Sequence, residues 1–326
     1  MFTSTKRVLQ QSRSRARARR TVVTPQTRKY RAIGTVGGPA LLLLIIVALW
    51  VHRGNGSGTL HDASALGIDS SGKVYVFNDS LSTQGPVLET LTATGKVIRR
   101  RQLPSEIQYA DQMVIDRDGT AYVSQYDNRV FKIPPHSPPQ AHQVPIRDID
   151  FTGIQAIDAA GNMYGTTFAQ VDKFSPDFVL LRTWGSFGNK HGQYRDARGV
   201  GVDHAGNIYV VSRDRATVVK LDPNGRWLAE WDASGDPYMG GPDLLALDSH
   251  GDVYVMDIGG YMIIKLSPRG QRLARWTIAG ACTRSDGLCS RTGIAVDNRD
   301  NVYTLDDSGN RIVKLSSRGK VLATWQ

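Results

Sequence analysis

VGVDHAGNIYV, residues Val200–Val210, is the stretch that decides the fold. An apolar run ends at Asp203, a turn follows through Gly206, and a second apolar run carries Tyr209 six residues after the aspartate. Asp accepts backbone N–H groups at the start of a tight turn, and Gly adopts the left-handed backbone that returns the chain. The stretch therefore predicts a β-hairpin.

This pattern occurs six times along the chain. The other copies are LGIDSSGKVYV from Leu66, MVIDRDGTAYV from Met113, QAIDAAGNMYG from Gln155, LALDSHGDVYV from Leu245 and IAVDNRDNVYT from Ile294. The six aspartates are spaced 47, 42, 45, 45 and 49 residues apart, and half of the 12 tyrosines hold the position six residues later. A period of about 40–50 residues is typical of one propeller blade.

Each unit continues with two more apolar segments. The third segment carries a lysine in units two to six, and Thr90 replaces it in unit one; the lysines are Lys132, Lys173, Lys220, Lys265 and Lys314. The fourth segment ends on a tryptophan in units three to six, namely Trp184, Trp231, Trp276 and Trp325. Four short strands per unit predict an all-β, six-bladed propeller. The repeated Tyr, Lys and Trp are interpreted as packing residues, with the lysine stem on a neighbouring aromatic ring.

The sixth unit, GIAVDNRDNVYTLDDSGNRIVKL (Gly293–Leu315), resembles the NHL repeat family through Asp306, Asn310 and Arg311. The stretch Trp184–Asp203 is similar to that family's glycine-rich link between blades. The resemblance implies a six-bladed NHL-type β-propeller. Known relatives include sensor domains of bacterial receptor kinases, RNA- or protein-binding domains, and metal-dependent lactonases or peptide-amidating lyases. Because one fold hosts many functions, the resemblance predicts the fold and not a reaction.

The N-terminal region is expected to anchor the chain in a membrane. Residues 1–31 hold ten Lys and Arg side chains and no acid, and residues 33–51, IGTVGGPALLLLIIVALWV, hold no charge. A helix of that length covers roughly 28 Å, close to the hydrocarbon thickness of a bilayer. The positive-inside rule keeps the basic side in the cytoplasm. We expect a cytoplasmic tail at 1–31, a transmembrane signal anchor at 32–52, a Gly/Ser linker at 53–59 and an exported propeller at 60–326.

Three alternatives remain for this region: a buried helix, a cleavable signal peptide and a nucleic-acid-binding tail. The apolar run has no polar face, and no small-residue cleavage site follows Val51. The chain has 40 Lys and Arg and 30 Asp and Glu, so residues after the tail carry 30 of each. A propeller without net charge lacks the basic footprint that phosphate-backbone binding needs, and we expect no nucleic-acid partner.

The residue five positions before each repeat aspartate is predicted to line one mouth of the central channel. In chain order these positions hold Ser64, Asp111, Gly153, Arg198, Asp243 and Thr292. A few convergent polar groups in a concavity are what a ligand pocket needs, so all of them except the glycine are candidate ligand-binding residues. The alternative is that they are solvated residues at the entrance of each blade.

No catalytic or metal-ligating residue is predicted. The histidines show no pair at zinc-site spacing, and neither a Ser-His-Asp nucleophile motif nor a phosphate loop is present. We therefore predict a membrane-anchored propeller, without a cofactor, that binds an extracytoplasmic protein, peptide or saccharide. The alternative is a lactonase-like hydrolase or a peptide-amidating-lyase-like enzyme that holds a divalent cation in the channel.

Cys282 and Cys289, the only cysteines, are predicted to form a disulfide in the link between units five and six. A close pair in an exported domain favours a disulfide, because two thiolates alone do not complete a zinc site. The bridge would stiffen a short loop on the mouth face, and two free thiols are the alternative.

The membrane topology gives the first testable prediction. Reporter fusions placed after residue 31 and after residue 60 are expected to report the cytoplasm and the exterior, respectively, because the ten cations precede the apolar run. Recovery of the intact chain as a soluble protein, or a mature N-terminus near residue 58, would contradict the signal anchor.

Overall fold

The computed structural model describes residues 63–79, 85–107, 110–125, 127–143, 151–235, 241–257, 262–278, 293–306 and 311–326. Every regular element in these ranges is a β-strand, and no membrane-spanning helix is found among them. The expected anchor at 33–51 lies outside the described residues.

The strands form six four-stranded antiparallel sheets, each built from consecutive strands in chain order. Blade 1 contains β1 (Ala63–Ile68), β2 (Val74–Asn78), β3 (Val87–Leu91) and β4 (Val97–Gln102). Blade 2 contains β5 (Ala110–Ile115), β6 (Ala121–Gln125), β7 (Arg129–Ile133) and β8 (Gln140–Gln143). Blade 3 contains β9 (Ile154–Ile157), β10 (Met163–Thr166), β11 (Val171–Phe174) and β12 (Leu180–Trp184). Blade 4 contains β13 (Ala197–Val202), β14 (Ile208–Ser212), β15 (Thr217–Leu221) and β16 (Trp227–Asp232). Blade 5 contains β17 (Pro242–Leu247), β18 (Val253–Asp257), β19 (Met262–Leu266) and β20 (Arg272–Thr277). Blade 6 contains β21 (Ile294–Val296), β22 (Val302–Leu305), β23 (Ile312–Leu315) and β24 (Val321–Trp325).

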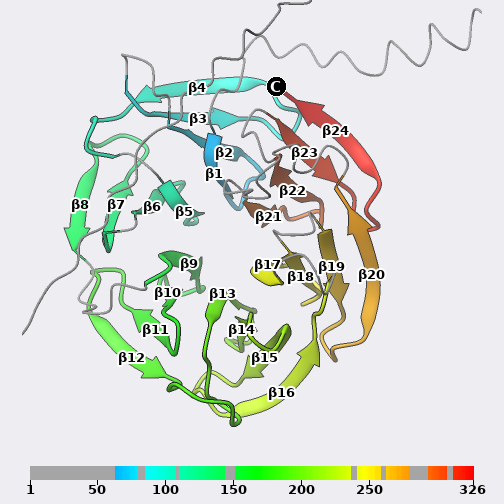
Figure 1. Cartoon of the computed structure of the whole chain (residues 1–326). Coiled ribbons are helices and arrows are strands. Elements are labelled where there is room, and N and C mark those ends of the chain that lie inside the picture. Colours follow the sequence, from blue (N-terminus) through cyan, green and yellow to red (C-terminus); the bar gives the residue numbers. More distant parts are fainter. Residues whose placement is uncertain are drawn as a thin grey trace, which may run out of the picture. The chain divides into compact units, whose positions relative to one another are not determined.

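The blades stand around a central channel, with the first strand of each blade innermost and the fourth at the perimeter (Figure 1). Successive innermost strands contact one another, and β21 contacts β1, so the ring is closed. The apolar cores lie between neighbouring blades, because the middle strands bury both faces. The six-bladed propeller predicted from the repeats is confirmed.

The repeat aspartate holds the turn between the first two strands of every blade. In blade 4 Asp203 Oδ1 accepts the backbone N–H groups of Ala205 at 3.0 Å and Asn207 at 2.8 Å. Its Oδ2 accepts the Tyr209 hydroxyl at 3.1 Å, and the equivalent Tyr-to-Asp bond forms in all six blades at 2.9–3.4 Å. One carboxylate thus fixes both the turn and the tyrosine ring.

The predicted packing of the repeated lysine and tryptophan is also seen. In blades 2 to 6 the lysine Nζ lies 4.8–5.9 Å from the centroid of the tyrosine ring. In blades 3 to 6 the tryptophan packs beside that tyrosine, with ring centroids 5.8–6.4 Å apart. Lys265 in blade 5 additionally pairs with Asp248 at 3.4 Å and Asp252 at 2.8 Å.

Each of these tryptophans packs on a glycine of the next blade, in the turn between its third and fourth strands. Trp184 covers Gly225, and its Nε1 donates a hydrogen bond to the carbonyl of Asn224 at 2.9 Å. A Cβ on that glycine would collide with the indole, and the same holds for Gly270, Gly319 and Gly95. All four glycines have φ of +79° to +84°. We call this contact the tryptophan–glycine lock.

The lock also closes the ring. Trp325 at the end of blade 6 packs on Gly95 in blade 1, and Lys314 Nζ donates to the carbonyl of Ala93 at 3.1 Å. No strand is exchanged between the two blades, because β1–β4 and β21–β24 form separate sheets. Among the described residues, side-chain packing joins the last blade to the first, together with the hydrogen bonds that Lys314 and Asn298 donate to backbone carbonyls of blade 1.

Asp300 stands where five of the six turns have glycine, and its φ is +61°. Its carboxylate reaches across to blade 5, accepting the backbone N–H of Ser249 at 3.0 Å and lying 3.1 Å from Nδ1 of His250. This bridge between two turns offsets part of the left-handed backbone cost, which is about 1–2 kcal/mol for a residue with a Cβ.

Two glycines of blade 1 allow the lock to be tested by a matched pair of variants. Gly95→Ala and Gly72→Ala carry the same backbone cost of about 1–2 kcal/mol, since φ is +84° and +81°. Only Gly95→Ala places a methyl group against Trp325, because nothing lies within 4 Å of a Cβ at Gly72. We expect Gly95→Ala to lose about 1–3 kcal/mol more unfolding free energy than Gly72→Ala in urea titrations. Equal losses would show that the lock contributes nothing to stability.

Candidate functional site

Four of the candidate residues lie in register shifts at the start of the innermost strands. The pairing of the first two strands is interrupted between Ala63 and Ala65, Ala110 and Gln112, Ala197 and Val200, and Pro242 and Leu244. These interruptions contain Ser64, Asp111, Arg198 and Asp243, respectively. A β-bulge re-aims the side chain that it carries. Strand alternation therefore does not decide where these four side chains point.

The structure separates the candidate residues into three groups. Asp111 lines the central channel. Ser64 is 7% exposed, and its Oγ has no hydrogen-bond partner among the described residues. Its side chain is therefore buried within blade 1, and its role in ligand binding stays a prediction. Thr292 and both cysteines lie outside the described residues.

Arg198 and Asp243 meet between blades 4 and 5, next to Gly199 and Leu244 of the channel wall, together with two charged residues that the spacing rule did not select. Arg198 Nε lies 2.6 Å from Asp196 Oδ1 and 3.8 Å from Asp243 Oδ1. Arg213 Nη1 lies 3.4 Å from the same oxygen of Asp243. The four side chains are 19–29% exposed. We call them the mouth cluster; it holds two positive and two negative charges.

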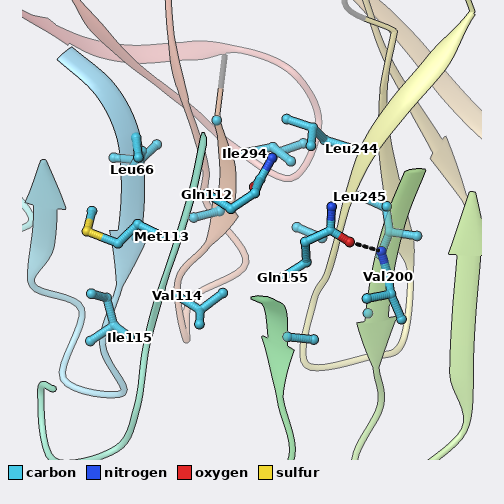
Figure 2. A pocket seen from close by; sticks show the side chains of 18 of the residues that line it. Leu66, Gln112, Met113, Val114, Ile115, Gln155, Val200, Leu244, Leu245 and Ile294 are labelled. Carbon is cyan, nitrogen blue, oxygen red and sulfur yellow. Dashed lines mark hydrogen bonds between the residues drawn. The ribbon is translucent and has the colours of Figure 1, made fainter. Parts of the chain in front are cut away.

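A glutamine from the neighbouring blade holds the backbone beneath the mouth cluster. Gln155 Nε2 donates to the carbonyl of Arg198 at 2.7 Å, and its Oε1 accepts the N–H of Val200 at 3.0 Å (Figure 2). Thr166 Oγ1 donates to the same Arg198 carbonyl at 2.6 Å. The blade 3–blade 4 junction thus fixes the strand that presents the arginine.

The channel itself is small. Its cavity measures about 240 Å³, and apolar side chains such as Leu66, Val114 and Leu244 share its wall with the polar Gln112 and Gln155. Side chains of these residues line the opening in Figure 2. Small-molecule sites usually enclose about 300–1,000 Å³. The channel is thus smaller than the usual site of a drug-sized ligand, and a peptide bound there would also contact the mouth.

Burial raises the pKa of the Asp243 carboxyl above its ordinary value, and the positive charges of Arg198 and Arg213 oppose the shift without cancelling it. The negative charges of Asp196 and Asp257 push the pKa in the same direction as burial. Burial thus disfavours the charged form of Asp243. A cationic group on a ligand would stabilise that charge.

Within the described ranges, the mouth cluster does not present a donor set suited to a divalent cation. Such a cation needs several oxygen or imidazole ligands aimed at one point, whereas Asp243 faces two arginines. Among the described residues, the one cluster of three potential ligands is Asp248, His250 and Asp300, in turns on the opposite face. Both Asp248 oxygens there already accept hydrogen bonds, Oδ1 from two backbone N–H groups and Oδ2 from a tyrosine hydroxyl.

Sequence reasoning missed Asp196, Arg213 and Gln155. Arg213 directly follows β14, in the loop between the second and third strands of blade 4. Such loops lie on the mouth face in a four-stranded antiparallel blade, so the position of Arg213 after the second strand could have predicted its place. Asp196 precedes Arg198 by two residues in the link between blades. Gln155 lies within the repeat itself, at a position that holds an apolar residue in the other units, such as Leu66 in blade 1 and Val200 in blade 4. The polar side chain at this apolar position was the one signal in the sequence.

Comparison with known proteins identifies the architecture. No family model matches the chain, and no curated protein matches it, so the NHL assignment remains a prediction. Solved structures of similar fold include a streptogramin B lyase, at 12% identity and a TM-score of 0.56 over 83% of this chain and 84% of that chain. Virginiamycin B lyase from Staphylococcus aureus is similar at 13% identity and a TM-score of 0.56, covering 82% and 86% of the two chains. At these identities the likeness establishes the propeller fold alone.

The shifted pKa of Asp243 predicts a pH dependence with a defined sign. A carboxyl whose pKa is raised on folding stabilises the fold below its unfolded pKa, and this stabilisation is lost as pH rises through the folded pKa. We expect Asp243→Asn to escape that loss, so its melting temperature relative to the parent protein should rise between pH 4 and pH 7.

Asp297 is the matched control for this titration. Burial would raise the pKa of its carboxyl, but hydrogen bonds from Asn301, from the Arg299 backbone and from Tyr303 together lower it. Asp297→Asn should therefore show the opposite trend, losing stability relative to the parent as pH rises. The same pH trend for both variants would contradict the assignment of Asp243 as the acid destabilised by burial.

Proposed function

We propose that the chain is a membrane-anchored, extracytoplasmic binding propeller whose mouth cluster recognises a peptide with both a positive and a negative group. The N-terminal charge and apolar pattern support the anchor, and the repeats support the absence of a second folded domain between anchor and propeller. The mouth cluster carries the proposal about the ligand: Asp196, Arg198, Arg213 and Asp243 converge at one opening with alternating charge.

The balance of charges favours a zwitterionic ligand over an anion or a cation. A carboxylate approaching Arg213 would gain a charge-assisted hydrogen bond, and an ammonium approaching Asp243 would relieve its unfavourable burial. A ligand with one charge would satisfy one half of the cluster and repel the other. Short peptides carry both kinds of group, an ammonium at one end and a carboxylate at the other, a few residues apart.

The alternative is a lyase or hydrolase, and the likeness to streptogramin B lyases favours it. One of the similar structures is a catalytically inactive virginiamycin B lyase with quinupristin, at 13% identity and a TM-score of 0.55. We rank this alternative second because Arg198 lies 3.8 Å from Asp243, the acid that a cation site at the mouth would need.

The proposal is tested with the purified full-length chain in detergent on an array of short peptides and peptidoglycan fragments. We expect zwitterionic peptides to bind, and blocking either terminus of a bound peptide to weaken binding at least tenfold, since each charged contact is worth about 1.5–3 kcal/mol. Arg213→Ala and Asp243→Ala should each weaken binding to a similar degree.

Asp232→Ala is the control variant, because Asp232 lies on the outermost strand of blade 4 and pairs with Arg272 away from the channel. It should bind the same peptides as the parent protein. Binding that ignores the peptide termini, or that survives both mouth variants, would contradict the proposal. Conversion of quinupristin by the parent chain, abolished by Asp243→Ala, would establish the enzymatic alternative instead.

A further inference from the structure

Blade 1 departs from the repeat at the lysine position, at the alanine position paired with it, and at the tryptophan position. In blades 4 to 6 the tyrosine pairs across the sheet with the repeat lysine and then with an alanine. In blade 1 the same ladder reads Tyr75, Thr90 and Arg99. The tryptophan position is also changed, because Arg101 pairs with Leu88 where Trp231 pairs with Val218 in blade 4.

A cavity of about 460 Å³ opens where the lysine and the tryptophan are missing. Its apolar wall includes Tyr75, Leu88, Ile133 and Pro135. Arg101 stands at the tryptophan position and donates hydrogen bonds to the carbonyls of Pro134, at 2.5 Å, and Ser137 in blade 2. The turns between first and second strands contribute to the lining, so this cavity opens on the face opposite the mouth cluster. We call it the blade 1–2 gap.

The gap is lined by four cationic side chains, namely Lys73, Arg99, Arg101 and Arg117. None of the four forms an ion pair with any residue in the described part of the chain. Burial, and then the positive charge of Arg99, lower the pKa of Arg101. The positive charge of Arg99 therefore acts on Arg101 within the gap.

Two acids line the same cavity as the four cations, so the side chains of its lining carry a net charge of +2. Asp69 is buried and holds its own turn through Ser71, Lys73 N–H and Tyr75, whereas Asp118 is exposed on the next turn. A phosphate monoester carries about −1.5 to −2 charges at pH 7 and offers three acceptor oxygens. The planar guanidinium group of arginine can donate two parallel hydrogen bonds to a phosphate, and an aromatic ring beside it can pack against an apolar ring of the ligand.

We propose that the blade 1–2 gap is a second ligand site, which takes a small phosphate monoester bearing a ring. Its volume lies within the range of about 300–1,000 Å³ typical of small-molecule sites. The phosphate is held by Arg99, Arg117 and Lys73, and the ring lies against Tyr75. This site is independent of the function proposed for the mouth cluster.

The test is isothermal titration calorimetry of the full-length chain in detergent with three probes: phenyl phosphate, inorganic phosphate and benzoate. Phenyl phosphate is expected to bind at least tenfold more tightly than benzoate, because its dianion matches the net charge of the gap. Inorganic phosphate should bind between the two, since it lacks the ring. Equal affinity for phenyl phosphate and benzoate, or no binding of phenyl phosphate at millimolar concentration, would overturn the proposal.

Two variants separate this site from general attraction to surface cations. Arg99→Ala introduces the residue found at the same ladder position in blades 4 to 6, so the sheet should fold, which an unchanged melting temperature checks. It should weaken phenyl phosphate binding at least tenfold. Arg182→Ala removes the arginine at that ladder position in blade 3, where Lys173 and Trp184 are present, and should leave binding unchanged. Equal effects of the two variants would contradict the site.

Discussion

The contact of a tryptophan with a left-handed glycine of the next blade is the interaction on which the ring depends. The indole needs a flat surface without a Cβ, and only glycine provides this at a positive φ without backbone strain. The same glycine turns the chain between the third and fourth strands, so one residue serves both its own hairpin and the neighbouring blade. Because the contact recurs at Gly95, it replaces the strand exchange that would otherwise be needed to join the first and last blades.

The lock also explains why the two candidate sites differ in kind. The mouth cluster lies at the start of the innermost strands, where the repeat conserves the register shift but not the residue type. Charged residues of blades 4 and 5 meet there. The blade 1–2 gap arises where the repeat itself fails, since Thr90 and Arg101 leave unfilled the space that Lys and Trp occupy elsewhere. The mouth cluster is thus built from residues outside the repeat pattern, whereas the blade 1–2 gap forms where the repeated lysine and tryptophan are absent.

The fold could be read from the sequence because each of its constraints recurs. Asp203 and Tyr209 have counterparts at fixed spacing in all six units, so a chance match is excluded and strand number, strand order and turn positions follow. The site was predictable only in part. Asp111 and Ser64 lie in equivalent register shifts of blades 2 and 1, yet Asp111 lines the channel and Ser64 is buried. A bulge changes side-chain direction through local hydrogen bonding and twist, which a period-two pattern does not encode. Arg213 and Asp196 were missed because they belong to non-repeating links.

Among the described blades, only blade 2 lacks the tryptophan–glycine lock at both of its junctions. Arg101 meets it through two backbone carbonyls, and on its far side His142 stacks on Phe178, 4.3 Å between ring centroids, where the other junctions have an indole on glycine. Among the described residues, the buried apolar cluster between blades 1 and 2 is larger than the one between blades 2 and 3. Local opening of a protein begins where buried apolar contact is least, so the ring should open first between blades 2 and 3. Closure of the ring would then be weakest at a single junction, on the side of blade 2 that faces blade 3.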